Sequence, residues 1–266
     1  MTRLNFLNIS IDNFTSVELL QRLAGGGTVY TPNVYHLLRL QQDREFYQVY
    51  QNADYCICDS QILWAVSRLL GRPIREKISG SDLFPAFYHY YRDDETVKIF
   101  LLGAAEGVGE KARSRINQKL QRNIVVGSYS PPYGFEADPA EGDRILERIQ
   151  ASGATVLAVG LGAPKQEKWI DRNRDRLPNV KVFMAIGATI DFEAGQVARS
   201  PRWMSRLGLE WLYRILMEPR RLWKRYVSDA LPFMVLVLTE RLGFYRDPFR
   251  DEPTYLRPNL GGRARS

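Results

Sequence analysis

Several polar residues of this 266-residue chain follow short apolar runs directly, where catalytic groups of α/β proteins often lie. Asp59 comes after the run Tyr55–Cys58. A carboxylate at the end of a buried strand can deprotonate a hydroxyl nucleophile, provided that its surroundings raise its pKa. The alternative is an N-cap for a helix that starts at Gln61, because Asp is favoured at that position. Position alone leaves both interpretations open.

Thr31, Asn33 and His36 follow an earlier apolar run that starts at Val29, and they could share a pocket with Asp59. Thr and Asn are also ordinary turn residues, and a lone His is more often structural than catalytic. For these three residues the pattern does not separate a functional role from a structural one.

A glycine-rich turn, Gly103-x-x-x-Gly107-x-Gly109, follows a strong apolar run and opens a helical pattern. Backbone N–H groups at such a turn can face a phosphate. Tight helix–strand packing without a ligand is the alternative. The same spacing occurs in short-chain dehydrogenases, but their Tyr-x-x-x-Lys pair is missing here, and no P-loop motif is present.

A second turn is more specific because two glycines, a proline and polar side chains lie close together. The residues are Gly160, Gly162, Pro164, Lys165, Gln166 and Glu167. Pro164 suits the first turn of a helix, which leaves the polar residues at the mouth of that helix. Gln166 could bind a base or a sugar hydroxyl. A capped helix with solvated charges is the alternative.

Apolar runs of strand length alternate with amphipathic segments over residues 1–199, the predicted catalytic domain. Strands are expected at Phe6–Ile9, Val29–Thr31, Tyr55–Cys58, Val97–Leu102, Ile124–Val126, Thr155–Leu161 and Val180–Ile186. Helices are expected at Val17–Leu23, Ile62–Leu70, Val108–Leu120, Ala140–Gln150 and Lys165–Leu177. This alternation predicts an α/β domain with a largely parallel, Rossmann-like sheet flanked by helices.

From Ser200 to Arg246 the sequence changes to Trp, Leu and Arg at helical spacings, which predicts a helical appendage. Its Arg-rich first half concentrates the net charge of +7. Basic segments of this kind bind nucleic acid, an anionic membrane surface or substrate phosphates. Nucleic acid is disfavoured, because no recognisable reading motif is present. Packing on the core or in a homo-oligomer is the alternative to membrane docking. Residues 247–266 predict a disordered tail.

The start of the chain lacks the apolar core of a signal peptide, and no apolar run reaches the roughly 20 residues of a spanning helix. We therefore expect a cytoplasmic protein with only peripheral membrane contact. Cys56 and Cys58 lie too close together for good disulfide geometry, and the chain has only two histidines. We expect buried, reduced thiols and no metal site.

Several motifs together resemble the WecG/TagA/CpsF glycosyltransferases, glycosyltransferase family 26. They are Thr-Pro-Asn at 31–33, Asp59, Gly-Ser-Asp at 80–82, Gly-Leu-Gly-Ala-Pro-Lys-Gln-Glu at 160–167, Gly-Ala-x-x-Asp at 187–191 and Arg-Ser-Pro-Arg-Trp at 199–203, which leads to Gly-Leu-Glu-Trp-Leu-Tyr-Arg at 208–214. The match extends from about Thr31 to Tyr226. One departure is Ser60, where relatives often have Gly, and it puts the local backbone and the acceptor fit in question.

The resemblance implies inverting, metal-independent transfer of a sugar from a UDP-sugar to a polyprenyl-diphosphate-linked acceptor in cell-surface polysaccharide synthesis, without a cofactor. The sugar would be N-acetylmannosamine, its uronic acid or a glucose-type sugar. By this analogy Asp59 is the general base, and Thr31 and Asn33 line its pocket. The expected substrate-binding residues are Gly103, Gly160, Gly162, Pro164, Gln166, Glu167, Asp191, Arg214, Arg221 and Arg225.

The chain contains no Asp-x-Asp pair of the kind that holds a metal on the diphosphate, which agrees with the implied metal independence. Arginine forks could then supply the positive charge. Two alternatives remain from the residues: a nucleotide-binding oxidoreductase, and a non-catalytic module that binds the inner membrane surface.

Overall fold

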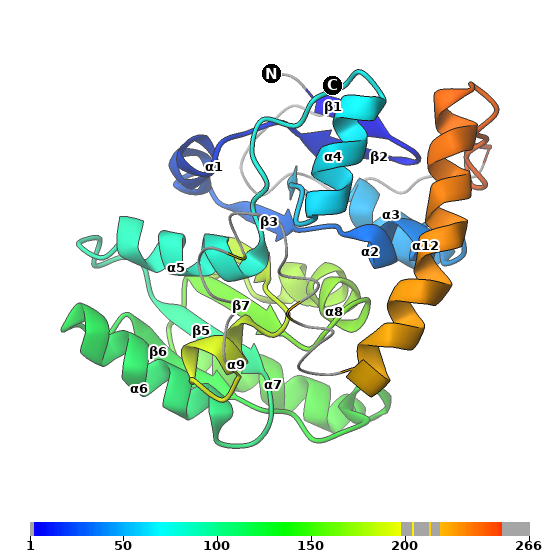
Figure 1. The fold of residues 1–266 in the computed structure, drawn as a ribbon. Helices are drawn as coiled ribbons and strands as arrows, with labels where there is room; N and C mark the ends of the chain where they lie inside the picture. Colours follow the sequence, from blue (N-terminus) through cyan, green and yellow to red (C-terminus); the bar gives the residue numbers. More distant parts are fainter. Residues whose placement is uncertain (1–2, 198–203, 205–212, 214–218, 252–266) are drawn as a thin grey trace.

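The structure is a computed structural model that describes residues 3–197 and 219–251, together with Met204 and Tyr213. Its centre is a parallel sheet of six strands in the order β4-β3-β8-β7-β5-β6 (Figure 1). The strands are β3 (Gly27–Tyr30), β4 (Tyr55–Cys56), β5 (Ile99–Gly103), β6 (Val125–Tyr129), β7 (Val156–Gly160) and β8 (Val182–Ala185). This architecture confirms the predicted Rossmann-like α/β fold.

The prediction of one strand over Phe6–Ile9 is wrong, because a turn occupies its middle. Strands β1 (Arg3–Phe6) and β2 (Ile9–Asp12) pair antiparallel on either side of that turn. Leu7 adopts a positive φ of 53°, and the side-chain amide of Asn8 donates to the carbonyl of Leu40 at 2.8 Å. Phe6 and Ile9, which suggested one strand, are therefore the last residue of β1 and the first residue of β2, on either side of the hairpin turn.

Helices connect and cover the strands. They are α1 (Ser16–Leu23), α2 (Val34–Arg39), α3 (Arg44–Gln51), α4 (Gln61–Leu69), α5 (Gly80–Tyr90), α6 (Val108–Leu120), α7 (Pro139–Ala151), α8 (Lys165–Asn173), α9 (Thr189–Glu193) and α12 (Pro219–Arg241), with short 3-10 helices at Phe135–Ala137 and Arg174–Arg176. Short polar residues start many of them: the side chains of Thr15, Asn33 and Asp43 accept backbone N–H groups at the starts of α1, α2 and α3.

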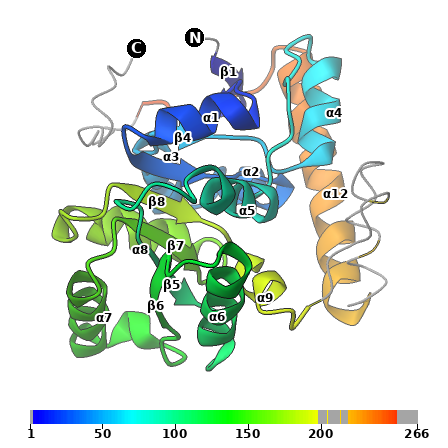
Figure 2. The ribbon, with the colours of Figure 1, turned by 90° about the vertical axis from the view of Figure 1, so that its left-hand side faces the viewer.

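Two hydrophobic cores lie on the two faces of the sheet, because successive strand residues point to opposite sides. In β3, Val29 belongs to the core that includes residues of α1, α5, α6 and α9, whereas Tyr30 belongs to the core that includes residues of α2, α3, α7 and α8. The views in Figures 1 and 2 show helices on both faces. The strands are almost continuously apolar because helices cover both faces of the sheet.

Helix α12 lies beside α2 and falls within the segment 200–246 that was predicted as a helical appendage (Figure 2). Phe233 and Val237 are buried in the core on that side of the sheet. The packed part of the chain continues past α12, because the ring of Phe249 lies 5.2 Å from that of Tyr47. The sequence analysis assigns Phe249 to the tail; residues 252–266 lie outside the described part. Within the described part, no helix is both long and apolar enough to cross a membrane.

Cys56 and Cys58 are buried free thiols, as predicted. Burial raises the pKa of Cys58 to about 12, so the neutral thiol is the stable form. Its Sγ donates to the carbonyl of Ser60 at 3.4 Å. These thiols are part of the core.

Candidate active site

All six strands of the central sheet are parallel, so their carboxyl ends meet along one edge. Thr31 follows β3, Asp59 comes shortly after β4, and Gly187 follows β8. Gln166 and Glu167 lie in the first turn of α8, the helix that follows β7. The sheet therefore brings most of the predicted site residues to one edge, which is where ligands bind in such folds.

Asp59 is held beside the segment that follows β3. The N–H of Ile57 donates to the carbonyl of Tyr30 at 3.0 Å, and that of Asp59 donates to the carbonyl of Pro32 at 3.1 Å. The parallel ladder thus continues beyond the two residues of β4. It places half-buried Asp59 beside the Thr31–Asn33 turn.

The N-cap interpretation of Asp59 is wrong, because Ser60 caps α4. The Ser60 hydroxyl accepts the backbone N–H of Leu63 at 3.3 Å. Asp59 lies one residue before the cap, and Ser60 has the capping role instead. Ser60 thus has a structural role of its own.

Asn33 and His36 join this site through the first turn of α2. The Asn33 Oδ1 accepts the backbone N–H groups of Tyr35 at 3.1 Å and His36 at 3.4 Å. The Nδ1 of His36 lies 2.8 Å from the same oxygen. The backbone N–H of Asn33 donates to Nδ1 at 3.3 Å, which completes a capping box at the start of α2.

A buried polar network connects His36 to α8. The Nε2 of His36 lies 3.4 Å from the Oε1 of Glu167, and both side chains are at most 7% exposed. The side-chain amide of Gln166 donates to the same Oε1 at 2.8 Å, and the Oε1 of Gln166 accepts the N–H of Gly187 at 3.1 Å. The loops after β3, β7 and β8 are thereby tied together.

Glu167 lies at the centre of this network and is 1% exposed. The Oε2 of Glu167 is buried without a hydrogen-bond partner among the described residues. Burial raises the pKa of Tyr50 well above its usual value, and the charge of Glu167 adds to this effect. Gln166 and Glu167 are thus buried anchors, and a capped helix with solvated charges does not describe them.

The glycines of the site differ in their structural roles. A Cβ on Gly103 would lie 2.4 Å from the carbonyl oxygen of Gly160, and one on Gly160 would lie 2.7 Å from that of Gly187. These two glycines allow the ends of neighbouring strands to approach closely. For Gly103 this favours the interpretation of close packing without a ligand. Gly162 has a positive φ of 77° and open space around it. Pro164 is the N-cap of α8 and follows a cis peptide bond. It lies one position before Lys165, where the helix was predicted to start and where α8 begins.

The remaining predicted residues are less closely tied to this network. Asp191 lies in the first turn of α9, and burial raises its pKa. Arg221 and Arg225 lie in α12, but their side chains are outside the described part, and Arg214 lies outside the described residues. Among the described residues, no three His, Cys, Asp or Glu side chains come together as a metal site.

Two features of this edge are missing from the sequence analysis. Lys77 lies beside the end of β4, because the N–H of its neighbour Ile78 donates to the carbonyl of Cys58 at 2.8 Å. Its charge acts to lower the pKa of the Cys58 thiol, against the larger effect of burial. The sequence contains no sign of this proximity.

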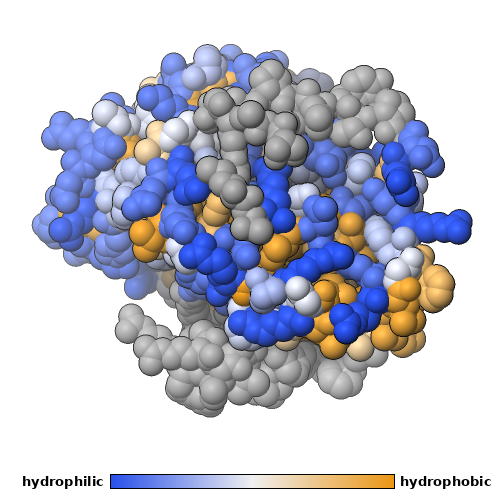
Figure 3. All heavy atoms as spheres, turned by 90° about the horizontal axis from the view of Figure 1, so that it is seen from above, coloured by the Kyte–Doolittle hydropathy of each residue, from blue (hydrophilic) through white to orange (hydrophobic). Residues whose placement is uncertain are grey.

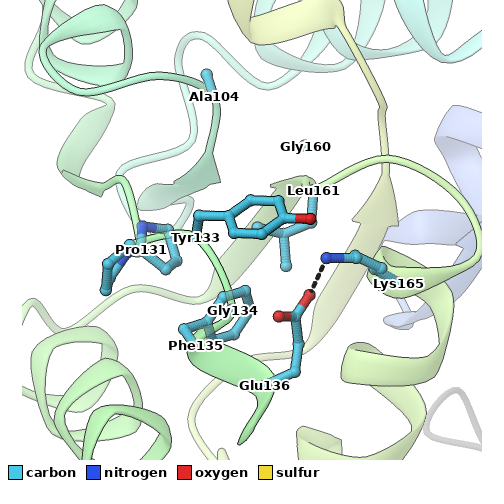
Figure 4. A pocket seen from close by; sticks show the side chains of 10 residues that line it. Ala104, Pro131, Tyr133, Gly134, Phe135, Glu136, Gly160, Leu161 and Lys165 are labelled. Carbon is cyan, nitrogen blue, oxygen red and sulfur yellow. Dashed lines mark ion pairs between the residues drawn. The ribbon is translucent and has the colours of Figure 1, made fainter. Parts of the chain in front are cut away.

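The other missing feature is a pocket of about 260 Å³ beyond β5, β6 and β7 (Figure 4). The loop after β6 supplies Tyr133, whose side chain is fully exposed, and Glu136. Lys165 of α8 binds Glu136, with 2.6 Å between Nζ and Oε1. The Pro131-Pro132 pair, which follows the expected strand Ile124–Val126 after a short gap, was a usable sequence signal for this loop.

Comparison with known proteins gives a consistent result. The model of the "Glycosyl transferase WecG/TagA/CpsF family" matches residues 4–247. An N-acetylglucosaminyldiphosphoundecaprenol N-acetyl-beta-D-mannosaminyltransferase of Bacillus subtilis (strain 168) is 30% identical over 229 residues, 85% of this chain and 86% of that protein. A protein of the same name from Bacillus spizizenii (strain W23) is 30% identical over 203 residues, 76% of each chain.

Proposed function

Because this chain belongs to the WecG/TagA/CpsF family of glycosyltransferases, we propose that it transfers N-acetylmannosamine from a UDP-sugar to polyprenyl-diphosphate-linked N-acetylglucosamine. The names of both relatives favour this sugar and this acceptor over a uronic acid or a glucose-type donor. The observation that supports the proposal most directly is the position of Asp59 beside Thr31 and Asn33, one residue before the cap of α4.

In the proposed reaction Asp59 accepts the proton of the acceptor hydroxyl. The hydroxyl oxygen forms a bond to the anomeric carbon of the donor sugar while the bond from that carbon to the UDP oxygen breaks, which inverts the configuration. Gln166, fixed between Glu167 and Gly187, would hold the donor side of the pocket. Preorganised groups of this kind stabilise developing charge without moving during the reaction.

The diphosphate that leaves needs positive charge. The chain has no Asp-x-Asp pair, and we propose that arginines of the appendage, Arg214, Arg221 and Arg225, supply that charge. Lys77 is a further cation near the Asp59 end of the sheet edge.

The variant Asp59→Asn tests the role of the base. It should lower turnover by about 10²- to 10⁴-fold, the usual contribution of a general base, while UDP-sugar affinity stays nearly unchanged. Asp93→Asn is the matched control, because the Asp93 side chain is 88% exposed at the surface. Near-normal transfer by Asp59→Asn would exclude Asp59 as the base.

We also propose that α12 docks the enzyme on the cytoplasmic face of the membrane that holds the acceptor. Apolar side chains on and just after the second half of α12 are at least 49% exposed: Leu231, Met234, Val235, Leu238, Leu242 and Phe244. Their spacing gives a stripe along one side of the helix, opposite the buried Phe233 and Val237. Figure 3 shows apolar side chains gathered on the side of the molecule where α12 lies.

Replacement of Leu231, Leu238 and Leu242 by Gln should abolish flotation with vesicles that contain anionic lipid, and should leave transfer to a water-soluble acceptor intact. Val17→Gln with Leu69→Gln is the matched control, since these residues are equally exposed elsewhere. If the triple variant instead dissociates a dimer and still floats, the stripe is a subunit interface and the docking proposal is wrong.

A further inference from the structure

The reaction proposed above assigns no role to His36, although this side chain is buried beside the active site. His36 is 6% exposed. Its ring lies among those of Tyr35, Phe46 and Tyr50, with centroids 6.0, 5.8 and 6.3 Å away. A polar ring in such surroundings is costly unless its nitrogens have partners. An apolar side chain would fill the same space without that cost, so packing alone does not account for a histidine at this position.

One ring nitrogen of His36 holds the first turn of α2. Its Nδ1 accepts the backbone N–H of Asn33 at 3.3 Å and lies 2.8 Å from the Asn33 Oδ1. The same Oδ1 accepts the backbone N–H groups of Tyr35 and His36. Because a backbone N–H can only donate, these contacts orient the Asn33 amide with its oxygen toward the helix and its nitrogen on the opposite arm of the planar group.

The amide nitrogen of Asn33 is available for a substrate at the active-site edge. Among the residues that the structure describes, its Nδ2 has no hydrogen-bond acceptor. The backbone N–H of Asp59 donates to the carbonyl of Pro32, the residue before Asn33, at 3.1 Å. Asn33 and Asp59 are both half-buried, so both reach solvent here. A carboxylate that accepts from one sugar hydroxyl and an amide that donates to a neighbouring oxygen are complementary partners for a sugar.

The other ring nitrogen of His36 connects this turn to the donor side of the site. Nε2 lies 3.4 Å from the Oε1 of Glu167, whose side chain is 1% exposed. That oxygen also accepts the amide of Gln166 at 2.8 Å. The Tyr30 hydroxyl donates to the backbone carbonyl of Glu167 at 3.3 Å, so the end of β3 and the start of α8 are joined at more than one point. His36 therefore lies between Gln166, the group proposed to hold the donor, and the turn that presents Asn33.

We propose that His36, anchored by Glu167, is a positioning residue for the transfer: it holds the Asn33 amide beside Asp59, and this amide donates to the acceptor sugar. The inference rests on the proposed function only in taking Asp59 as the base and a sugar as the acceptor. In this role His36 touches neither substrate. It acts through Asn33 on the acceptor and through Glu167 on the donor, and substitution can separate these two effects.

Two variants of His36 remove its contacts in different combinations. His36→Leu removes both, whereas the amide of His36→Asn can take the place of Nδ1 and keep the contact with Asn33 alone. Misplacing a group at a site costs up to about 10²-fold, so His36→Leu should lower kcat/KM for the acceptor by about ten- to hundredfold and also raise KM for the donor. His36→Asn should recover most of the acceptor kcat/KM but keep the raised donor KM. His89→Leu is the matched control, because His89 is exposed on α5.

A variant of Asn33 tests whether His36 acts through it. Asn33→Ser removes the amide nitrogen and keeps a good N-cap residue, so it should lower acceptor kcat/KM without unfolding α2. In the His36→Leu background, Asn33→Ser should add little to the loss, because the amide is already misplaced. Losses that multiply would overturn the proposal. So would a His36→Leu variant that keeps both KM values and loses only the fraction of folded enzyme, since that is the result of a merely structural role.

A measurement without substrates separates this proposal from the proposed function. In ¹⁵N relaxation of the whole protein, the Asn33 side-chain amide, identified by its absence in Asn33→Ser, should have an order parameter of about 0.85, and this should fall below about 0.6 in His36→Leu but not in His36→Asn. An equally rigid amide in His36→Leu would overturn the positioning role. If the amide loosens as expected but the unaltered protein transfers no sugar, His36 holds Asn33 and the proposed reaction is wrong.

Discussion

The buried contact between His36 and Glu167 should make a large contribution to stability, and His36→Leu tests its size. Leucine can pack against the rings of Phe46 and Tyr50, whose centroids lie 5.8 and 6.3 Å from that of His36, so the main loss is polar. The variant removes the His36 contact from Glu167, which is 1% exposed, and keeps the hydrogen bond from the Gln166 amide.

Leaving a buried polar group without one of its partners costs about 1–3 kcal/mol. We expect the upper end, about 3 kcal/mol, because Glu167 is 1% exposed and water cannot easily replace the lost contact. In a chain of this size, each kcal/mol lowers Tm by roughly 2–4 °C. The melting temperature should therefore fall by about 6–12 °C.

Urea unfolding at pH 7.5 measures the free energy directly. His89→Leu is the matched control, because His89 is exposed on α5. In the double variant His36→Leu/Glu167→Leu, the cost should be smaller than the sum of the two single costs by at least about 1 kcal/mol. Additive costs, or a His36→Leu variant no less stable than His89→Leu, would refute the assignment of a coupled buried pair.

Three further predictions follow from particular residues. Gly160→Ala should destabilise the fold by about 1–3 kcal/mol in urea unfolding, since its Cβ would lie 2.7 Å from the carbonyl oxygen of Gly187, whereas Gly142→Ala, in open space on α7, should not. Transfer should survive exhaustive EDTA treatment and gain nothing from added Mn²⁺; a strict metal requirement would contradict the proposed role of the arginines. Because burial raises the pKa of Cys58 from 9.0 to about 12, its stabilising contribution should be present below about pH 9 and be lost as the pH rises toward 12, and Cys58→Ala should reduce this loss in unfolding measured from pH 8 to 11.

The periodicity of the sequence predicted the sheet well because most strands are buried on both faces. β5 and β7 are each a run of apolar residues ending in glycine, and such runs stand out against amphipathic helices. The failure at Phe6–Ile9 has the same origin: Phe6 and Ile9 are both buried, but they belong to two strands, and nothing in the apolar pattern marks the left-handed Leu7 between them.

The short helices and the caps were harder to predict. α2 has six residues and α9 has five, too few to repeat an apolar spacing. Asp59 and Ser60 are both good N-cap residues, and the choice between them depends on where the backbone leaves the ladder with Pro32. That is a tertiary property, so the sequence could not resolve it.

The site also contains features that the sequence could predict and others that it could not. Thr31, Asn33, Asp59, Gln166 and Glu167 were predicted because each comes shortly after a strand. The contact between His36 and Glu167 joins residues 131 positions apart, and only the order of the sheet, with β8 between β3 and β7, brings their loops together. His36 therefore looked like a lone histidine, and its partner looked like a solvated charge.

The order of the strands also suggests why donor and acceptor would meet at Asp59. On our proposal the general base, Asp59, follows the edge strand β4, whereas Gln166, which would hold the donor, follows β7 further along the sheet. Near β4, Glu240 of α12 forms an ion pair with Arg72, which follows α4, at 2.9 Å. The apolar stripe of α12 and the helix that follows Asp59 therefore belong to one packed unit. A lipid-linked acceptor held at that stripe would then approach Asp59 from the edge of the sheet, while the donor approaches along it, and the two substrates would not compete for one entrance.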